Sequence, residues 1–266
     1  MKRVIITFLV FSIVLITLAI NPSFTTEKLV AGASDTMAAA NRQYETSQYL
    51  LASQAYQQLV DQGIVHPNLF YNLGNAYFKQ GELGKAILNY RRAQLISPRD
   101  ADISANLNLC RGQKVDRLEN ENNEGIITYL AGFTRQRLTL NELAILTLGL
   151  WFLVTILLMI LITPLLKGNW KESIQYSCII LGLLLILCAV SLGSRLYVDH
   201  NSPDGVIQVK QVDVSSAPGG QSVKQFTLHD GAEVTIIEQR ADWVRLALPG
   251  GKLQGWAPSN AVGIIQ

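Results

Sequence analysis

Few residues in this 266-residue chain could do chemistry, and their spacing does not bring them together. The candidates for metal binding or nucleophilic catalysis are His66, His200, His229, Cys110, Cys178 and Cys188. The histidines lie in three different regions, and neither H-E-x-x-H nor C-x-x-C occurs. Gly84-Lys85 lacks the glycine five residues earlier that a phosphate-binding loop needs. We therefore predict a protein that is not an enzyme and that holds no cofactor or metal.

The charged residues do not indicate chemistry either. The carboxylates that come closest to forming a group are Asp102, Asp116, Glu119 and Glu121, and their spacing is typical of a solvated face. The net charge of +2 is too small to favour a nucleic-acid partner. Only 16% of the residues are charged, against about 25% in an average soluble domain, so long apolar segments must be present.

Residues 67–100 read PNLFYNLGNAYFKQGELGKAILNYRRAQLISPRD, which is 34 residues and has the pattern of a tetratricopeptide repeat (TPR). Small residues stand where two antiparallel helices must touch, aromatic residues fill the space beside them, and a proline without an N–H ends the second helix. The residues assigned to this packing are Leu73, Gly74, Tyr77, Ala86, Tyr90, Ala93 and Pro98. Helix pairs of this kind bind a protein or peptide.

A weaker repeat precedes this one in the same frame. Over residues 33–66, Ala40, Ala52, Tyr56 and Leu59 keep the pattern, while Gln43 replaces an aromatic residue. After residue 100 an apolar spacing predicts a helix that caps the stack. We assign residues 34–120 to helical repeats with this cap, and residues 121–141 to an acidic polar linker.

The partner groove of such a stack is lined by positions of the first helix of each repeat. In the stronger repeat these are Asn68, Tyr71, Asn75 and Phe78. In some TPR families an Asn at the position of Asn75 clamps the C-terminal carboxylate of a peptide, but that clamp also needs a lysine where this chain has Tyr71. The alternative is that Asn75 bonds a neighbouring helix. We predict contact with a protein or peptide through this groove, with no particular motif.

Three apolar blocks predict a membrane protein. The first follows Lys2 and Arg3, and it makes residues 1–33 either a secretory signal or a retained membrane anchor. The others, at about 143–166 and 173–194, are uncharged, and at ~1.5 Å per residue each is long enough to cross a hydrocarbon core of ~30 Å. Residues 139–142 form a capping box at the start of the former. A short turn joins the two, so residues 142–196 predict a transmembrane helical hairpin.

A hairpin returns the chain to the side that it left, so the parts before and after it share one side of the membrane. By the positive-inside rule, Lys2, Arg3, Lys167 and Lys171 favour a cytoplasmic N-terminus and a cytoplasmic turn. Three arginines on the other side of the hairpin oppose this orientation. We expect a multi-pass protein of a bacterial inner membrane, with both soluble parts in the periplasm.

Residues 203–266 change to a strand-like period, with five short strands that suggest a small β-barrel. The order of an early Val-x-Val strand, a turn at 228–231, Asp242-Trp243-Val244 and Gly255-Trp256 resembles a bacterial SH3 (SH3b) domain. The likeness to SH3 peptide grooves implies that Trp243, Pro258 and Asn260 lie on a binding surface. The alternative is that the tryptophans serve packing.

The order of segments along the whole chain resembles the BatE type of the Bacteroides aerotolerance (Bat) membrane proteins. It consists of an apolar N-terminus, two TPR units, an acidic linker, a transmembrane hairpin and an SH3b barrel. The resemblance implies an inner-membrane protein that works with von Willebrand factor A-type Bat partners and a MoxR-type AAA+ ATPase in stress tolerance.

Together these observations predict a membrane-anchored adaptor that recruits proteins through the TPR groove and the SH3b barrel. The main rival is a receptor that senses or binds peptidoglycan through the barrel. An envelope hydrolase is the third possibility, and it predicts activity on a zymogram.

Overall fold

The computed structural model describes residues 33–116, 126–163, 169–201, 203–219, 222–249, 251 and 253–265. The expectations for the N-terminal apolar block, the acidic stretch at 117–125 and the turn at 164–168 lie outside the described residues. The architecture consists of a stack of helices, a pair of long apolar helices and a C-terminal antiparallel sheet. The sequence predicted these three parts in this order.

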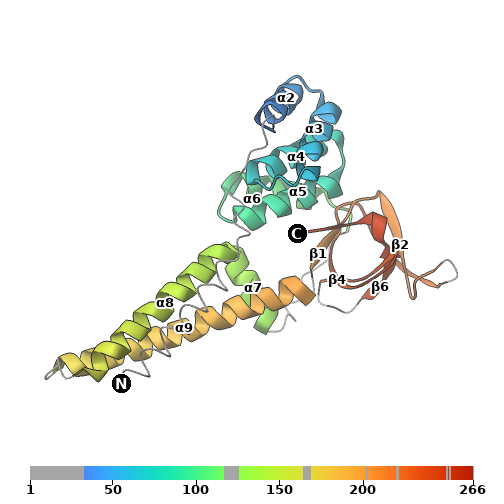
Figure 1. The fold of residues 1–266 in the computed structure, drawn as a ribbon. Coiled ribbons are helices and arrows are strands. Elements are labelled where there is room, and N and C mark those ends of the chain that lie inside the picture. Colours follow the sequence, from blue (N-terminus) through green and yellow to red (C-terminus); the bar gives the residue numbers. More distant parts are fainter. Residues whose placement is uncertain are drawn as a thin grey trace. The chain divides into compact units, whose positions relative to one another are not determined.

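Five helices form the N-terminal stack: α2 (Ala33–Glu45), α3 (Tyr49–Asp61), α4 (Pro67–Gln80), α5 (Leu83–Ile96) and α6 (Ala101–Gln113) (Figure 1). The chain marks their ends locally. Pro67 opens α4, where its missing N–H costs no hydrogen bond, and Gly81 closes α4 at φ 79°, a conformation that glycine adopts without strain. Asp100 caps α6 by accepting hydrogen bonds from the N–H groups of Asp102 and Ile103.

Helices α4 and α5 pack closely because one residue at their contact has no side chain. A Cβ on Gly74 would lie 2.8 Å from Cε1 of Tyr90, so the tyrosine ring lies directly on the backbone of α4. The other residues assigned to repeat packing are also inside. Leu73, Ala86, Ala93 and Tyr90 are at most 1% exposed, Pro98 is buried, and Tyr77 is half-buried.

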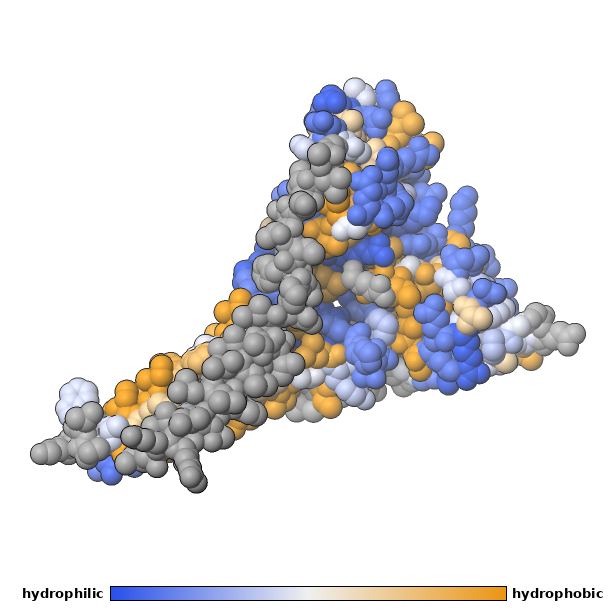
Figure 2. Space-filling model, in the orientation of Figure 1, coloured by the Kyte–Doolittle hydropathy of each residue, from blue (hydrophilic) through white to orange (hydrophobic). Residues whose placement is uncertain are grey.

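In the described part of the chain, two helices are long and apolar enough to cross a membrane: α8 (Leu140–Ile162) and α9 (Asn169–Asn201), which pack side by side (Figure 1). The capping box expected before α8 is confirmed, since Thr139 and Glu142 exchange side-chain-to-backbone hydrogen bonds. Large apolar side chains remain exposed along both helices, among them Ile145, Ile156, Ile180 and Leu183 at 52–67% (Figure 2).

The structure differs from the sequence-based expectation within residues 121–141. A ten-residue helix, α7 (Ile126–Arg135), occupies part of the segment that was expected to be a linker. It packs against α9, and Ala131 is only 2% exposed. The prediction extended the acidic linker over a short apolar run, IITYLAGFTR, which forms this helix. A helix of ten residues is too short to be stable alone, so its stability comes from packing against α9.

The C-terminal part is one antiparallel sheet with the strand order β3-β2-β6-β5-β4-β1-β7. Its strands are β1 (Asp204–Ile207), β2 (Gln211–Ser215), β3 (Lys224–His229), β4 (Glu233–Arg240), β5 (Trp243–Ala247), β6 (Gln254–Pro258) and β7 (Val262–Ile264). The sheet curls around a core that includes Val214, Leu228 and Leu246 (Figure 1). The described part has seven strands rather than five. The first apolar run divides into β1 and β2, and β7 follows a 3₁₀ turn to pair with β1.

The helical stack and the sheet share a hydrophobic core. Val206 of β1 and Ile265 after β7 are buried in one cluster with Ile87 and Leu88 of α5 and Cys110 of α6. Burial raises the pKa of the Cys110 thiol to about 11. The sheet therefore packs directly on the second helix of the stronger repeat and on the cap helix.

Candidate partner-binding surfaces

A repeated polar contact holds the helices of the stack in register. In the first repeat, Oδ1 of Asn41 accepts hydrogen bonds from the hydroxyl of Tyr56 at 2.6 Å and from Nδ2 of Asn72 at 3.2 Å. Burial raises the pKa of Tyr56 to about 12, so the phenol stays a donor. This contact links both helices of the repeat to the first helix of the next one.

The same contact recurs 34 residues later. Oδ1 of Asn75 accepts from the hydroxyl of Tyr90 at 2.6 Å and from Nδ2 of Asn106 at 3.0 Å. Asn106 lies on α6, so this helix takes the place that the first helix of a third repeat would occupy. The amide oxygen of Asn75 is therefore engaged within the stack, which favours the helix-bonding alternative over a carboxylate clamp.

The four residues expected to line the partner groove lie along α4, but their side chains differ in how far they are exposed to a partner. Asn68 is exposed in the first turn. Tyr71 and Phe78 are half-buried against the core shared with the sheet, and the hydroxyl of Tyr71 accepts from Asn106. The structure thus leaves Asn68 open and uses Tyr71, Asn75 and Phe78 at least in part to hold neighbouring helices.

A second surface of the stack was not foreseen from the sequence. A hollow of about 420 Å³ lies where α3, the end of α4 and the start of α5 meet. Carboxamides and hydroxyls dominate its lining, which is Leu50, Ser53, Gln54, Gln57, Gln58, Asp61, Tyr77, Gln80, Glu82 and Lys85. Glutamines on a helix have no diagnostic spacing, so no sequence signal pointed to this hollow.

The candidate surface residues of the sheet lie close together, where β5 begins and β6 ends. Trp243 on β5 is the cross-strand partner of Pro258 on β6, and Asn260 follows in the 3₁₀ turn. Trp243 and Pro258 are half-buried and Asn260 is exposed. Trp256, in contrast, is 6% exposed, and Arg240 lies over its ring at 5.2 Å.

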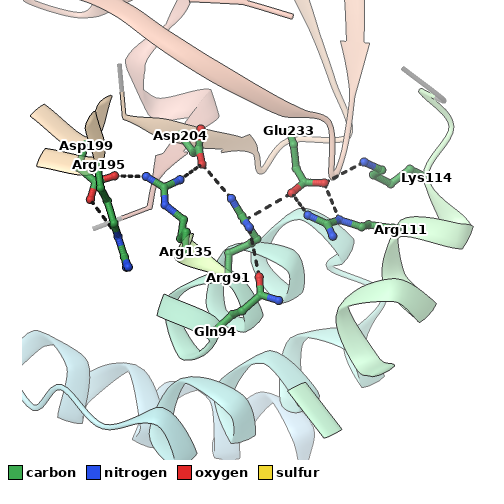
Figure 3. A network of polar contacts seen from close by, with 9 residues as sticks. All are labelled: Arg91, Gln94, Arg111, Lys114, Arg135, Arg195, Asp199, Asp204 and Glu233. Atoms are coloured by element: carbon green, nitrogen blue, oxygen red, sulfur yellow. Dashed lines mark hydrogen bonds and ion pairs between the residues drawn. The ribbon is translucent and has the colours of Figure 1, made fainter. Parts of the chain in front are cut away.

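A chain of ion pairs also joins the helical stack to the sheet (Figure 3). Glu233 of β4 accepts a two-pronged contact from Arg111 of α6, at 2.9 and 2.6 Å, and a third bond from Lys114 at 3.1 Å. Burial alone would raise the pKa of Glu233, but Arg111, with Arg91 and Lys114, outweighs this effect and lowers it to about 2. The carboxylate is therefore charged at neutral pH.

The chain of ion pairs continues from the sheet to α7 and to the C-terminal end of α9. Asp204 of β1 accepts from Arg91 of α5 at 2.8 Å and from Arg135 of α7 at 2.9 Å. Arg135 also pairs with Asp199 near the end of α9, and Nη1 of Arg195 donates to the carbonyl of Leu138 at 2.7 Å. Side chains from α5, α7, α9 and β1 thus meet at one place (Figure 3).

The end of β3 and the turn that follows it supply two further contacts. Oδ1 of Asp230 accepts from the N–H of Gly84 at 2.9 Å, so a residue of the sheet caps the first turn of α5. His229 contacts Asp116, whose carboxylate accepts from the backbone N–H at 2.6 Å and lies 2.9 Å from Nδ1. The expectation that Asp116 lies on a solvated face is wrong, because its side chain is only 15% exposed in this contact.

Residues 67–100 match the model of the tetratricopeptide repeat family. These are the bounds predicted for the repeat from its period. No curated protein matches the chain. Among the residues that the structure describes, no group of three or more histidines, cysteines or carboxylates could hold a metal ion.

Proposed function

We propose that this protein is a membrane-anchored adaptor, in which α8 and α9 cross a bilayer and the helical stack binds a protein partner. The observation that carries the proposal is the attachment of a tetratricopeptide repeat to two paired helices whose large apolar side chains stay exposed. A soluble protein would bury such side chains, whereas lipid chains cover them at no cost.

The contact between the stack and the sheet supports a hairpin. Residues 33–116 precede α8, and residues 203–265 follow α9, yet their side chains share one core and several ion pairs. Parts that touch lie on the same side of a membrane, which requires an even number of crossings between them. Two crossings, one by α8 and one by α9, meet this requirement.

The orientation follows from the lysines and arginines of the sequence. A cytoplasmic N-terminus and a cytoplasmic turn place the stack and the sheet in the periplasm of a bacterial inner membrane. Alkaline phosphatase fused after Gln266 should then be active, and a cytoplasmic reporter at the same place should be inactive. The opposite pattern of activities would reverse the orientation. If a protease added to one side of sealed vesicles cut the stack near Tyr77 but never the sheet near Trp256, the hairpin itself would be refuted.

The adaptor role predicts where a partner binds. A photo-crosslinking amino acid at Asn68, the exposed member of the predicted groove, should capture a protein in membranes, while the same amino acid at Gln58 in the polar hollow should not. Capture only at position 58 would move the partner site to the hollow. The resemblance to the BatE type supports a von Willebrand factor A-type Bat protein or a MoxR-type ATPase as the captured partner.

A second candidate function is binding of peptidoglycan by the sheet, read as an SH3b barrel. It is favoured by the grouping of Trp243, Pro258 and Asn260 where β5 begins and β6 ends, because none of the three belongs to the core shared with the stack. Retention of the detergent-solubilised full chain on purified sacculi, lost in Trp243→Ala and kept in Asn68→Ala, would favour this sensor. If the unaltered chain is not retained on sacculi, the sensor function is ruled out and the adaptor function remains.

A further inference from the structure

Helix α7 carries an aromatic face that remains about half exposed in the part of the chain that the structure describes. The side of α7 that holds Ala131 packs against α9, while Tyr129 and Phe133, one helical turn apart, lie on another side and are 61% and 45% exposed. Their rings stack with centroids 6.4 Å apart. The guanidinium of Arg137 lies 4.2 Å from the centre of the Phe133 ring. An exposed aromatic pair with an arginine beside it needs a partner of matching chemistry.

The level of α7 along α9 is fixed by two side-chain contacts. The hydroxyl of Ser191 donates to that of Thr134 at 3.2 Å, and Arg135 pairs with Asp199. Ser191 lies in the last turn of the uncharged run of α9, which ends at residue 194, and Asp199 lies beyond it. The C-terminal end of α7 is therefore level with the boundary between the apolar and the charged parts of α9.

That boundary is where a membrane helix leaves the hydrocarbon core. Aromatic side chains concentrate at this depth because their rings tolerate both acyl chains and polar headgroups. Arginine suits it as well, since a guanidinium can stack on a ring and still reach a phosphate oxygen. Short helices with one apolar face and basic residues nearby lie flat at this depth.

We propose that α7 is an interfacial helix whose Tyr129–Phe133 face is covered by phospholipid. The inference rests on the proposed hairpin, because only a bilayer crossed by α9 brings lipid to this level. The expected position of the face is roughly 5–10 Å into the boundary of headgroups and acyl chains. Arg137 then points toward lipid phosphates, while Arg135, which is paired with two aspartates, holds the helix to the body of the protein.

The test places an environment-sensitive fluorophore on the face and measures its depth. The full chain, with its three cysteines replaced by alanine, carries a single new cysteine labelled with NBD, and it is reconstituted in phosphatidylcholine nanodiscs. Nitroxides sit either near the headgroup or deep in the acyl chain of the lipid. For Tyr129→Cys we expect blue-shifted emission and quenching that is at least about twofold stronger by the shallow nitroxide. Phe133→Cys provides an independent second site.

Two control positions make the outcomes separable. Leu183→Cys on α9, 64% exposed, should be quenched best by the deep nitroxide, and Leu50→Cys on α3, 60% exposed, should be quenched by neither. If position 183 is deep but position 129 shows water-like emission, the α7 inference is overturned and the hairpin stands. Blue-shifted emission at 129 without quenching also overturns it, because a protein or a second copy then covers the face. If position 183 is not quenched, the hairpin fails together with the inference.

Discussion

Gly84→Ala should loosen the contact between the helical stack and the sheet. Gly84 is the second residue of α5, and the sheet approaches its backbone so closely that a Cβ would overlap the carbonyl oxygen of Ile207 and Oδ1 of Asp230. The added methyl group would also lie 3.0 Å from the backbone nitrogen of Gly231. Two of these three atoms belong to the backbone, so the clash cannot be relieved by moving one side chain. The substitution instead forces the sheet away from α5.

The expected cost follows from three terms. Moving the sheet weakens the bond from the Gly84 N–H to Asp230, and a hydrogen bond to a charged group contributes about 1.5–3 kcal/mol. Overpacking by a methyl group costs about 1–3 kcal/mol. Alanine is the better helix former and returns up to about 1 kcal/mol. The net destabilisation is about 3 kcal/mol, or a fall in Tm of roughly 6–12 °C for a body of this size.

Gly112→Ala is the matched control, because Gly112 also lies in a helix but a Cβ there would meet no atom within 4 Å. Intrinsic tryptophan fluorescence during heating of the full chain in detergent measures Tm for both variants, and hydrogen exchange reports protection of the first turn of α5. Gly112→Ala should melt at or slightly above the Tm of the unaltered protein. If Gly84→Ala behaves like the control and keeps its protection, the sheet does not dock at α5 as described.

Three further predictions concern named groups. Glu233, whose pKa is about 2 when folded and 4.5 in its ordinary state, should contribute stability above pH 4.5 that is lost as the pH falls toward 2; the loss is roughly 3 kcal/mol at most. Glu233→Gln should flatten this part of the stability profile in urea titrations, and an unchanged profile would contradict the ion-pair assignment. Tyr90→Phe removes one of two donors from the partly buried amide oxygen of Asn75 and should cost about 1–2 kcal/mol in the same titration, whereas no loss would mean that the contact is not structural. The Cys110 thiol, buried and with its pKa raised to about 11, should react with Ellman's reagent only on unfolding; rapid reaction in the native state would show that the shared core opens.

The helical repeat could be predicted from the sequence because its determinants are local. The small residue Gly74, the ring of Tyr90 that lies on it and the helix-ending Pro98 all fall within one 34-residue period. The two long apolar helices could be predicted equally well, since length and composition alone define them. In each case the information needed lies within a few turns of the chain.

The docking of the sheet on the stack could not be read in the same way. Its determinants are pairs more than 100 residues apart, such as Gly84 with Asp230 and Arg111 with Glu233. Each member looks ordinary in its own segment: a glycine near a helix start, an aspartate in a turn, an arginine at a helix end. The short apolar helix α7 was missed for a related reason, because its partner α9 follows only after α8.

The shared core also changes how an adaptor of this kind would work. Two modules on a flexible chain gain from a high effective concentration, but their separation varies. Here the sheet is held on α5 and α6 by buried apolar side chains and by ion pairs, so any sites at Asn68 and at Trp243 keep one separation. A partner that engages both must match that separation, and it loses little conformational entropy in doing so. Selectivity would then come from geometry, and weakening the interface at Gly84 should reduce two-site binding while leaving each single site intact.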